Sequence, residues 1–551
     1  MMATTGSTIS RPVQTYYRRA DPFLAATLLL GALLRTLYAL PTHVCFGDES
    51  FYLWLAQNLF SGEGYTYYND VPEVHFPPLF PIALGLFNVV VQNWEVVSRV
   101  AYVVFGTALI FPVYLLASEA YSRRLARIAA FITALLPAFT AGVLFAESLS
   151  EPLYLLCLFS GIYHLYRAFS GQAWRSYAFA GAAFSLAYLT RPEGCLYFFL
   201  ALASLSLYTL IRRPFSFWQG VGRLGILAGS FLLLACPYLI YVHQEVGRWL
   251  LTTKGVTTYL TTRGLVHHDG AAFLRDTWGL NDEGEVHFYA HDFEGGVPQL
   301  LVGRYRHRLI PDIKANLENA YDVLLAHPFF GKSLLFLALL GIFGSTWNRE
   351  RLSFEGFQLL MLTPLTSFLI FFIHERYLYP LLLPLVLWLS VGVEHLLSWI
   401  VTTSLPRFLN TSRARRVLQV GFLLLLGAYL AQTGYRVFVT QRSNETDIWE
   451  LTAALKKHTP ADAIVLCPYP QYSFHAQRRW LPLPIAPLED VLTYGKSRGA
   501  TYLALGATRI ENRPEEQRHF LQEARDRPGL ELLASGGDNP KAAYVIYRMT
   551  D

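Results

Sequence analysis

Charged residues are scarce in this sequence of 551 residues. They make up 15% of it, against about 25% in soluble domains. Hydrophobic residues reach 53%, and the mean hydropathy is +0.31. The small net charge of +5 gives no reason to expect a nucleic-acid partner. This composition argues against a soluble protein and predicts a multi-pass membrane protein, whose interfacial belts would use the 15% of aromatic residues.

Cysteine and the common catalytic signatures are also missing or rare. The chain has five cysteines and no C-x-x-C pair, which argues against a disulfide framework and against a zinc site. No G-x-S-x-G, P-loop or Rossmann motif occurs in a suitable context. No internal repeat is visible, nor the inverted symmetry found in many transporters.

Long apolar runs are what the chain does contain. A transmembrane helix needs roughly 17–25 residues, and about eleven runs approach this length. The first one lacks a small-residue cleavage site, so we expect an uncleaved anchor. The runs are 22–41, 98–118, 124–140, 148–168, 175–190, 195–211, 222–243, 331–346, 355–373, 377–400 and 415–434.

Positive charge alternates between successive loops. Cytoplasmic loops are enriched in Lys and Arg, and every second loop is basic. The first outer loop instead has no Lys or Arg between Arg35 and Arg99. We therefore expect a cytoplasmic N-terminus. The basic loops carry Arg11, Arg18 and Arg19; Arg123, Arg124 and Arg127; Arg167 and Arg175; Arg212, Arg213 and Arg223; Arg349 and Arg351; and Arg407, Arg413, Arg415 and Arg416.

The predicted organisation has three parts. Residues 1–20 form a cytoplasmic tail. Residues 21–440 form an all-α membrane domain with outer loops 42–97 and 244–330. Residues 441–551 have ordinary soluble composition and alternate helix-like and strand-like segments, which predicts a small extracytoplasmic α/β domain. The strand-like segments are 463–469, 501–507 and 543–549, and the helix-like ones are 448–458, 487–499 and 514–527.

Polar side chains gather where the predicted spans meet the outer surface. Ionisable groups at membrane depth are costly, so their default interpretation is a functional site. We expect these junctions to form one pocket that binds and converts a substrate. Its candidate residues are Asp48, Glu49, His75, Arg99, Glu147, Glu151, Arg191, Glu193, His374, Glu375, Arg376 and Tyr377.

Each candidate also has a plainer explanation. Asp48 could cap the helix that follows it. Arg191 and Glu193 could form only a local ion pair. Glu147 and Glu151, four residues apart, could hold a cation, or one of them could pair with an arginine. His75 could be an interfacial residue, and 374–377 a polar turn. The histidines at 267–268, 287 and 291 are better explained by a solvated loop than by zinc.

The stretch GDESFYLWLAQNLFSGEGY (47–65) is the most informative of these motifs. Phe51 and Trp54 lie on one helical face, and we expect this face, with Leu59, to rest in the membrane interface. The adjacent carboxylates of Asp48 and Glu49 should repel each other. Such repulsion raises one pKa and makes a better base.

Five motifs in series resemble those of the GT-C glycosyltransferases. They are residues 47–65, HFPPLFP (75–81), FAESLSEPLYLL (145–156), YLTRPEG (188–194) and HERYLYPLLLPL (374–385). The resemblance extends over about the first 440 residues. The sequence is most similar to the bacterial relatives of protein O-mannosyltransferases and of the lipid A aminoarabinose and lipopolysaccharide galacturonic acid transferases. This resemblance implies a bacterial inner membrane. The terminal domain resembles the small outer domains of many such proteins.

The resemblance implies an enzyme that takes a hexosyl or pentosyl group from a polyprenyl-phosphate donor. The acceptor would be a glycan, a lipid or a protein at the outer face, and the reaction would invert the anomeric centre. Asp48, followed by Glu49, takes the position of the family's base. Arg376 is the first choice for holding the donor's phosphate, and Arg191 the second. Many relatives have Lys before the proline pair, where this chain has His75, so any phosphate contact there would depend on pH.

Two alternatives stay open. A transporter or flippase for a lipid-linked or polar substrate would place charges and broken helices at the bilayer midplane. An inactive protein of the same fold could serve as a scaffold. The sequence requires no cofactor and predicts no metal site, although a divalent cation is not excluded.

Overall fold

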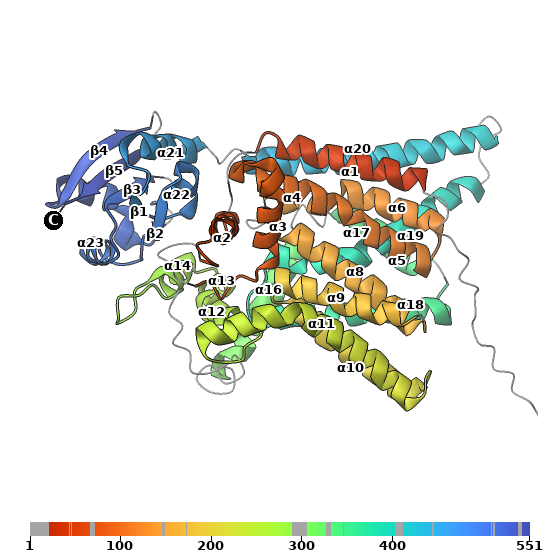
Figure 1. The fold of residues 1–551 in the computed structure, drawn as a ribbon. Coiled ribbons are helices and arrows are strands. Elements are labelled where there is room, and N and C mark those ends of the chain that lie inside the picture. Colours follow the sequence, from red (N-terminus) through yellow and green to blue (C-terminus); the bar gives the residue numbers. More distant parts are fainter. Residues whose placement is uncertain are drawn as a thin grey trace, which may run out of the picture.

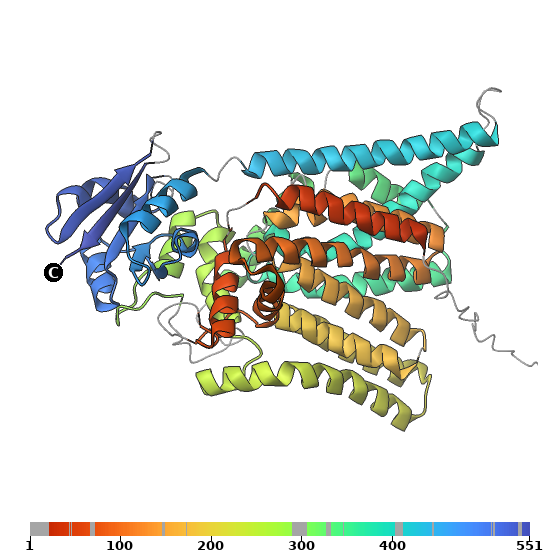
Figure 2. The same ribbon diagram turned by 45° about the horizontal axis from the view of Figure 1, so that its top comes forward.

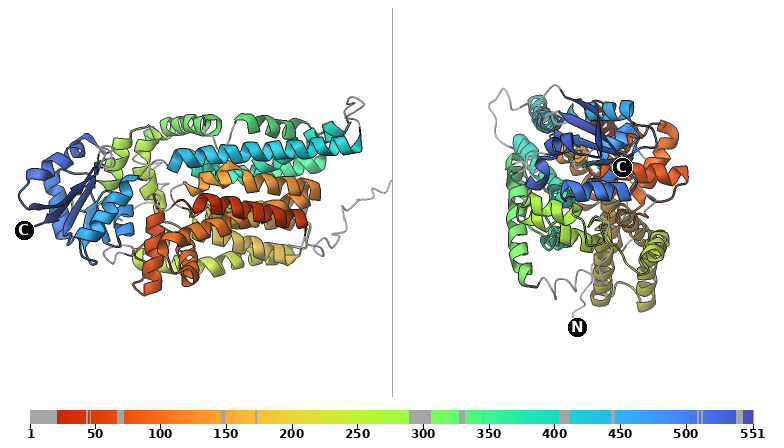
Figure 3. Two further views of the ribbon diagram at one scale, coloured as in Figure 1. Left: turned by 90° about the horizontal axis from the view of Figure 1, so that it is seen from above. Right: turned by 90° about the vertical axis from the view of Figure 1, so that its left-hand side faces the viewer.

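The computed structural model of the protein has two parts, a helical bundle and a C-terminal domain with a β-sheet (Figure 1). Seen from above, the molecule is elongated, with the C-terminal domain at one end of the bundle (Figure 3). The structure describes residues 21–42, 45, 47–66, 72–145, 149–171, 173–288, 306–326, 332–344, 346–402, 411–442, 446–507, 510, 513–537 and 543–550.

Within the described residues, every predicted apolar run falls mainly on helix, although the run 124–140 is bent and the run 355–373 passes from α18 into the 3-10 helix η4 (Thr363–Leu369). The long helices of the bundle are α1 (Pro22–Ala39), α4 (Trp94–Ala108), α5 (Ile110–Ala120), α6 (Arg123–Leu135), α8 (Glu151–Phe169), α9 (Trp174–Thr190), α10 (Gly194–Arg212), α11 (Phe217–Val246), α17 (Lys332–Phe343), α18 (Arg349–Leu362), α19 (Leu382–Thr402) and α20 (Ser412–Arg442). Helices α4 and α5 follow each other directly and together make one predicted span.

Fewer helices pass a strict test for crossing a membrane. Within the described residues, six are long and apolar enough, or seven if the bent pair Arg123–Leu135 and Pro137–Leu144 counts as one span. Helices α8 and α9 lie inside the bundle, and most of their residues are buried by protein. The protein is an integral membrane protein. The number of about eleven membrane spans stays a prediction.

The two ends of the bundle differ in charge, as the loop pattern predicts. The junctions α5–α6, α8–α9 and α10–α11 and the start of α20 carry arginine-rich segments and lie at the end far from the C-terminal domain (Figure 2). The opposite end carries α2 (Glu49–Ser61), α3 (Leu79–Val91) and the C-terminal domain (Figure 1). The chain reverses after α2 at Gly62, whose φ of 88° suits a residue without a side chain.

The span after α5 is broken near the end that carries α2. A bend of 63° separates α6 from the short η2 (Pro137–Phe139) and α7 (Ala141–Leu144), because Pro137 cannot continue the helix. The buried Arg35 of α1 satisfies the backbone there: its guanidinium donates to the carbonyls of Ala134 (3.3 Å) and Phe139 (2.9 Å). Arg35 was not among the residues predicted from the sequence. Its buried charge stabilises the carbonyl groups that the break leaves without helical hydrogen bonds.

The C-terminal domain contains a five-stranded mixed sheet in the order β2-β1-β3-β5-β4. Strands β1 (Ile464–Cys467), β3 (Tyr502–Gly506) and β5 (Tyr544–Met549) confirm the three predicted strands, and β2 (Arg479–Pro482) and β4 (Leu530–Gly536) were not predicted. Strand β1 pairs in parallel with β2 and β3, and β5 pairs antiparallel with β3 and β4. The helical elements are α21 (Thr446–His458), α22 (Pro470–Ala476), α23 (Leu488–Ser497), α25 (Glu515–Arg518), α26 (Phe520–Glu523) and η6 (Ala524–Asp526).

The loop over residues 244–330 is more ordered than its composition suggests. It forms α12 (Lys254–Thr261), α13 (Arg263–Val266), α14 (Gly270–Trp278), η3 (Arg306–Arg308) and α16 (Leu309–Ala326). Its histidines contribute to this local order: His267 Nε2 lies 2.8 Å from Asp312 Oδ1, and His287 Nε2 lies 3.2 Å from the carbonyl of Leu280. His291 lies outside the described residues.

The apolar face of α2 packs against protein and does not rest in the membrane interface. Trp54 meets Phe474 edge to face at 5.6 Å, and Phe51 meets Trp480 at 5.3 Å. Both partners belong to the C-terminal domain, and Phe51 and Trp54 are buried. The expectation of a membrane-facing surface was wrong, because periodicity shows that a face is apolar but not what covers it.

Candidate active site

Asp48 stands at the N-terminal end of α2, but its side chain does not cap the helix. Its backbone is helical (φ −69°, ψ −10°), and its carboxylate makes no capping hydrogen bond. The carboxylate is 30% exposed, and its Oδ2 lies 3.5 Å from Nη1 of Arg376. A contact of this length is weak and easily exchanged. The plain capping explanation is therefore not what the side chain does.

Glu49 is buried and has a different partner from Asp48. Its Oε1 accepts from Arg99 Nη1 at 2.7 Å, and Arg99 Nε also donates to the carbonyl of Thr42 at 3.2 Å. Arg99 therefore clamps the chain on both sides of Asp48 and neutralises Glu49. The predicted repulsion between the carboxylates of Asp48 and Glu49 is not expected in this structure, because Arg99 compensates the negative charge of Glu49. Gly47, with a φ of 44°, lets the chain turn immediately before Asp48.

Arg376 is held in place from two directions. It lies in the first turn of η5 (Glu375–Leu381), and His374 caps this turn by accepting the Arg376 N–H at Nδ1 (3.5 Å). The stretch before it is fixed by buried Asn316 of α16, which donates to the carbonyl of Leu369 (3.0 Å) and accepts from Ile373 N–H (3.2 Å). The long outer loop thereby sets the approach of Arg376 to Asp48.

The turn between α9 and α10 carries a second ionic cluster. Arg191 Nη1 lies 2.7 Å from Glu151 Oε1, and Arg191 Nη2 lies 3.3 Å from Glu193 Oε1. Burial lowers the pKa of Arg191, but Glu193 and Glu151 outweigh this and hold it above its ordinary value. Gly194 is required, because a Cβ there would lie 2.3 Å from the backbone N of Tyr188.

Glu151 thus pairs with an arginine, one of the two alternatives for the acidic motif. Its neighbour in that motif, Glu147, lies outside the described residues. No group of three or more His, Cys, Asp or Glu side chains able to hold a metal ion occurs among the residues that the structure places.

Tyr377 joins the two clusters. The guanidinium carbons of Arg191 and Arg376 lie 5.5 and 5.4 Å from the centre of its ring. Its ring also stacks on Phe368, with centroids 4.7 Å apart. Asp48, Arg376, Tyr377, Arg191, Glu151 and Glu193 therefore form one site from four distant segments. Glu375 is half-buried on the same turn as Arg376.

His75 lies in a neighbouring group. It is buried, its Nε2 lies 3.5 Å from Thr257 Oγ1, and its ring stacks on Phe288 at 5.3 Å. Its Nδ1 lies 3.5 Å from Glu73. Burial raises the pKa of Glu73. Hydrogen bonds from the His75 side chain and from the backbone N–H groups of His75 and Phe76 outweigh this effect and hold the pKa below its ordinary value. This carboxylate stabilises the turn that precedes the proline pair.

Lys254 is a residue that sequence reasoning missed. It begins α12, and its Nζ lies 4.7 Å from the ring centre of Phe76. Burial raises the pKa of Glu193, whereas Arg191 and also Lys254 lower it, so Lys254 lies within electrostatic range of the site. A signal was available: Lys254 is the first lysine in the chain, at the end of a long lysine-free region.

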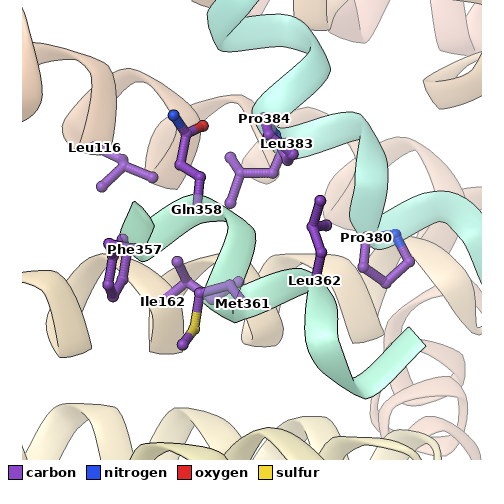
Figure 4. A pocket seen from close by; sticks show the side chains of 9 residues that line it. All are labelled: Leu116, Ile162, Phe357, Gln358, Met361, Leu362, Pro380, Leu383 and Pro384. Carbon is purple, nitrogen blue, oxygen red and sulfur yellow. The ribbon is translucent and has the colours of Figure 1, made fainter. Parts of the chain in front are cut away.

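One small cavity lies deeper in the bundle and is unsuited to a substrate. Figure 4 shows it among α5, α8, α18 and the η5–α19 segment, lined by apolar side chains and by Gln358. Its volume of about 10 Å³ leaves room for no more than about one water molecule. The polar groups that can do chemistry are those around Asp48.

Comparison with known proteins points in the same direction. The sequence model of the dolichyl-phosphate-mannose-protein mannosyltransferase family matches residues 75–241. The chain matches no curated protein by sequence. Among solved structures, ArnT from Cupriavidus metallidurans bound to undecaprenyl phosphate superposes with a TM-score of 0.58 and 12% identity, over 96% of this chain and 98% of ArnT.

The fold of the chain is therefore similar to that of the GT-C glycosyltransferases. A second GT-C structure supports this: the oligosaccharyltransferase AglB from Archaeoglobus fulgidus, in complex with an inhibitory peptide and dolichol phosphate. Its TM-score is 0.51 and its identity 16%, over 89% of this chain and 69% of AglB. The mycobacterial arabinofuranosyltransferase AftD has a TM-score of 0.50 and 14% identity, over 97% of this chain and 42% of AftD. The predicted GT-C architecture with a small C-terminal α/β region is confirmed.

Proposed function

We propose that this GT-C protein is a glycosyltransferase that moves a sugar from a polyprenyl-phosphate donor to an acceptor hydroxyl at the outer face of a membrane. The observation that carries this proposal is the uncapped, partly exposed carboxylate of Asp48, which faces the guanidinium of Arg376. A base and a phosphate-binding cation side by side suit transfer from a phosphate leaving group. The match to ArnT bound to undecaprenyl phosphate supports this donor class.

The reaction follows from these positions. Asp48 accepts the proton of the acceptor hydroxyl as its oxygen forms a bond to the anomeric carbon. The bond from that carbon to the phosphate oxygen breaks, and polyprenyl phosphate leaves with the electron pair. A single displacement of this kind inverts the anomeric centre. Arg376 stabilises the negative charge of the phosphate, to which guanidinium groups bind well.

Arg191 is a weaker candidate for the phosphate than Arg376. It already makes contacts of 2.7 and 3.3 Å with Glu151 and Glu193. A phosphate would have to compete with two carboxylates for the same guanidinium. We propose Lys254, instead of Arg191, as the second cation that binds the phosphate. Among the described residues its ammonium has no ion pair within 4 Å, and it lies over Phe76 at the rim of the site.

The remaining candidates act around this centre. We assign Arg191, Glu151, Glu193 and Tyr377 to the walls that hold the sugar and orient Arg376. Glu49 and Arg99 fix the turn of Asp48, and His75 supports the neighbouring loop. We place the N-terminus in the cytoplasm and the C-terminal domain outside, because the arginine-rich junctions lie at the far end of the bundle. The resemblance to bacterial relatives supports the bacterial inner membrane as the location.

A transporter is the second candidate, since the span around Pro137 is broken. In a transporter, broken backbone lines a cavity. Here the freed carbonyls bind buried Arg35, which favours a structural explanation of the break.

The test is reconstitution of the purified protein in liposomes with radiolabelled polyprenyl-phosphate hexoses and pentoses and with glycolipid, glycan and peptide acceptors. We expect label in an acceptor with the wild type and none above background with Asp48→Asn. Transfer at the full rate by Asp48→Asn would remove Asp48 as the base. Movement of the donor between leaflets without transfer would favour the transporter.

A further inference from the structure

His475 of the C-terminal domain contacts the chain just before Asp48, and this contact has no part in the reaction proposed above. Its side chain is fully buried on α22, and its Nε2 lies 3.1 Å from the backbone N of Cys45, 430 residues earlier in the chain. Cys45 precedes Asp48 by three residues. A backbone N–H can only donate, so Nε2 must be the unprotonated acceptor nitrogen. The contact thus ties the C-terminal domain to the segment that carries the proposed base.

The other ring nitrogen of His475 is also held. Its Nδ1 lies 3.4 Å from Oε1 of Glu95, in the first turn of α4. With Nε2 bare, the proton of the neutral ring is on Nδ1, where it points at this carboxylate. Trp449 of α21 packs beside the ring, with centroids 4.8 Å apart. Both the tautomer and the orientation of the imidazole are therefore set by neighbours.

Helix α4 connects this contact to the clamp on the other side of Asp48. Glu95 and Arg99 lie four residues apart and thus on one face of the helix. Arg99 holds Glu49 and the carbonyl of Thr42, and Glu95 orients the histidine that holds Cys45. The chain is thereby fixed before and after Asp48 against a single rigid element.

The aromatic contacts between α2 and the C-terminal domain cannot fix the position of Asp48 as accurately as these hydrogen bonds do. The pairs Trp54–Phe474 and Phe51–Trp480 bury apolar surface, but such contacts are non-directional and tolerate small shifts. A hydrogen bond to a backbone N–H weakens steeply as its geometry changes. Reaction rates are sensitive to shifts of this size, since a misplacement of 1 Å can cost about 10²-fold.

We infer that His475 is a positioning residue: it fixes the backbone at Cys45 and so makes the placement of Asp48 depend on docking of the C-terminal domain. This inference rests on the proposed function for its effect on rate, and on the geometry alone for its effect on the backbone. The C-terminal domain then completes the active site without contacting the donor.

Two variants separate the hydrogen bond from packing. His475→Phe keeps a ring in the buried space but has no acceptor, and His475→Gln offers an amide oxygen near the position of Nε2. We expect His475→Phe to lower kcat about 10-fold with the donor KM unchanged within about 2-fold, and His475→Gln to recover most of the loss. His458→Phe, at the exposed end of α21, is the matched control and should behave like the wild type.

A second measurement does not require activity. Hydrogen–deuterium exchange of the full-length protein in detergent micelles should show faster exchange of the Cys45 amide in His475→Phe, by about 10-fold, with protection restored in His475→Gln. If His475→Phe does not fold, Glu95→Ala removes the partner of Nδ1 at a partly exposed position and should give a smaller change in the same direction.

The outcomes are distinguishable. Unchanged exchange at Cys45, an unchanged kcat in His475→Phe, or no recovery in His475→Gln would each overturn the positioning role. Faster exchange at Cys45 in a preparation whose wild type transfers no sugar would keep the backbone constraint and reject the proposed function.

Discussion

Asp48 and Glu49 are neighbours in the sequence, yet their surroundings differ completely. Glu49 is buried and fully committed to Arg99 at 2.7 Å. Asp48 is partly exposed and reaches Arg376 only at 3.5 Å. The short buried pair maintains the fold, whereas the longer, partly exposed pair can exchange its contact for contacts with a substrate. A charged pair next to an active site can therefore be structural or reactive, and its geometry and burial decide which.

The variant Asp48→Asn tests the difference between Asp48 and Glu49 with the largest expected effect. Loss of the base should lower the transfer rate by about 10² to 10⁴-fold. Thermal denaturation in detergent should be unchanged, because the side chain caps nothing and is partly exposed. Initial rates with a radiolabelled donor measure the first effect. A large loss of stability would place Asp48 in the same class as Glu49.

The reverse result is expected for Glu49→Gln. This change leaves the Arg99 charge buried without a carboxylate and should reduce the free energy of unfolding by about 3–5 kcal/mol. Denaturant titration followed by tryptophan fluorescence would measure it. The double variant Glu49→Gln with Arg99→Met removes the stranded charge and should recover part of the loss. If Glu49→Gln is as stable as the wild type, the pair does not clamp the turn.

Arg376→Gln tests the cationic partner of the open pair. We expect the transfer rate to fall about 10²-fold, because one charge-stabilising donor is lost, and Arg376→Lys to recover a fraction because it keeps the charge but not the planar fork. Arg124→Gln, at the far end of the bundle, is the control. Equal rates for wild type and Arg376→Gln would leave the phosphate to another cation.

A smaller effect is expected for Lys254→Gln. Its ammonium lies at the rim of the site, and a half-buried cation contributes less than a fully buried one. The donor KM should rise about 3- to 10-fold with little change in kcat, and increasing salt should reduce the difference from wild type. A fall in kcat at constant KM would instead place Lys254 in the transition state.

The smallest effect concerns the turn that contains Glu73. The net pKa of this buried carboxylate is below its ordinary value of 4.5. Its contribution to stability is thus fully present above pH 4.5 and is lost as the pH falls through the lower folded value. Hydrogen exchange of the amides of residues 73–76 should accelerate below pH 4.5 in the wild type. Glu73→Gln should remove this pH dependence.

Much of the membrane domain could be predicted from the sequence. A hydrophobic run has one stable conformation in lipid, since only a helix satisfies its own backbone there. The eleven runs therefore all fall on helices, and the arginine-rich junctions fall at one end. The strands β2 and β4 and helices α12–α16 were missed, because short elements are decided by neighbours that a local pattern does not contain.

The site shows the same division in finer detail. Sequence alone determined that polar groups lie at one end of the spans and that Asp48 begins a helix, because both depend on local order and the cost of charge in lipid. Only the tertiary structure decided which of them meet. It joined Glu49 to Arg99 and left Asp48 facing Arg376, brought Lys254 to the rim, and covered α2 with the C-terminal domain. These contacts join residues up to hundreds of positions apart, and the packing of the whole chain selects them.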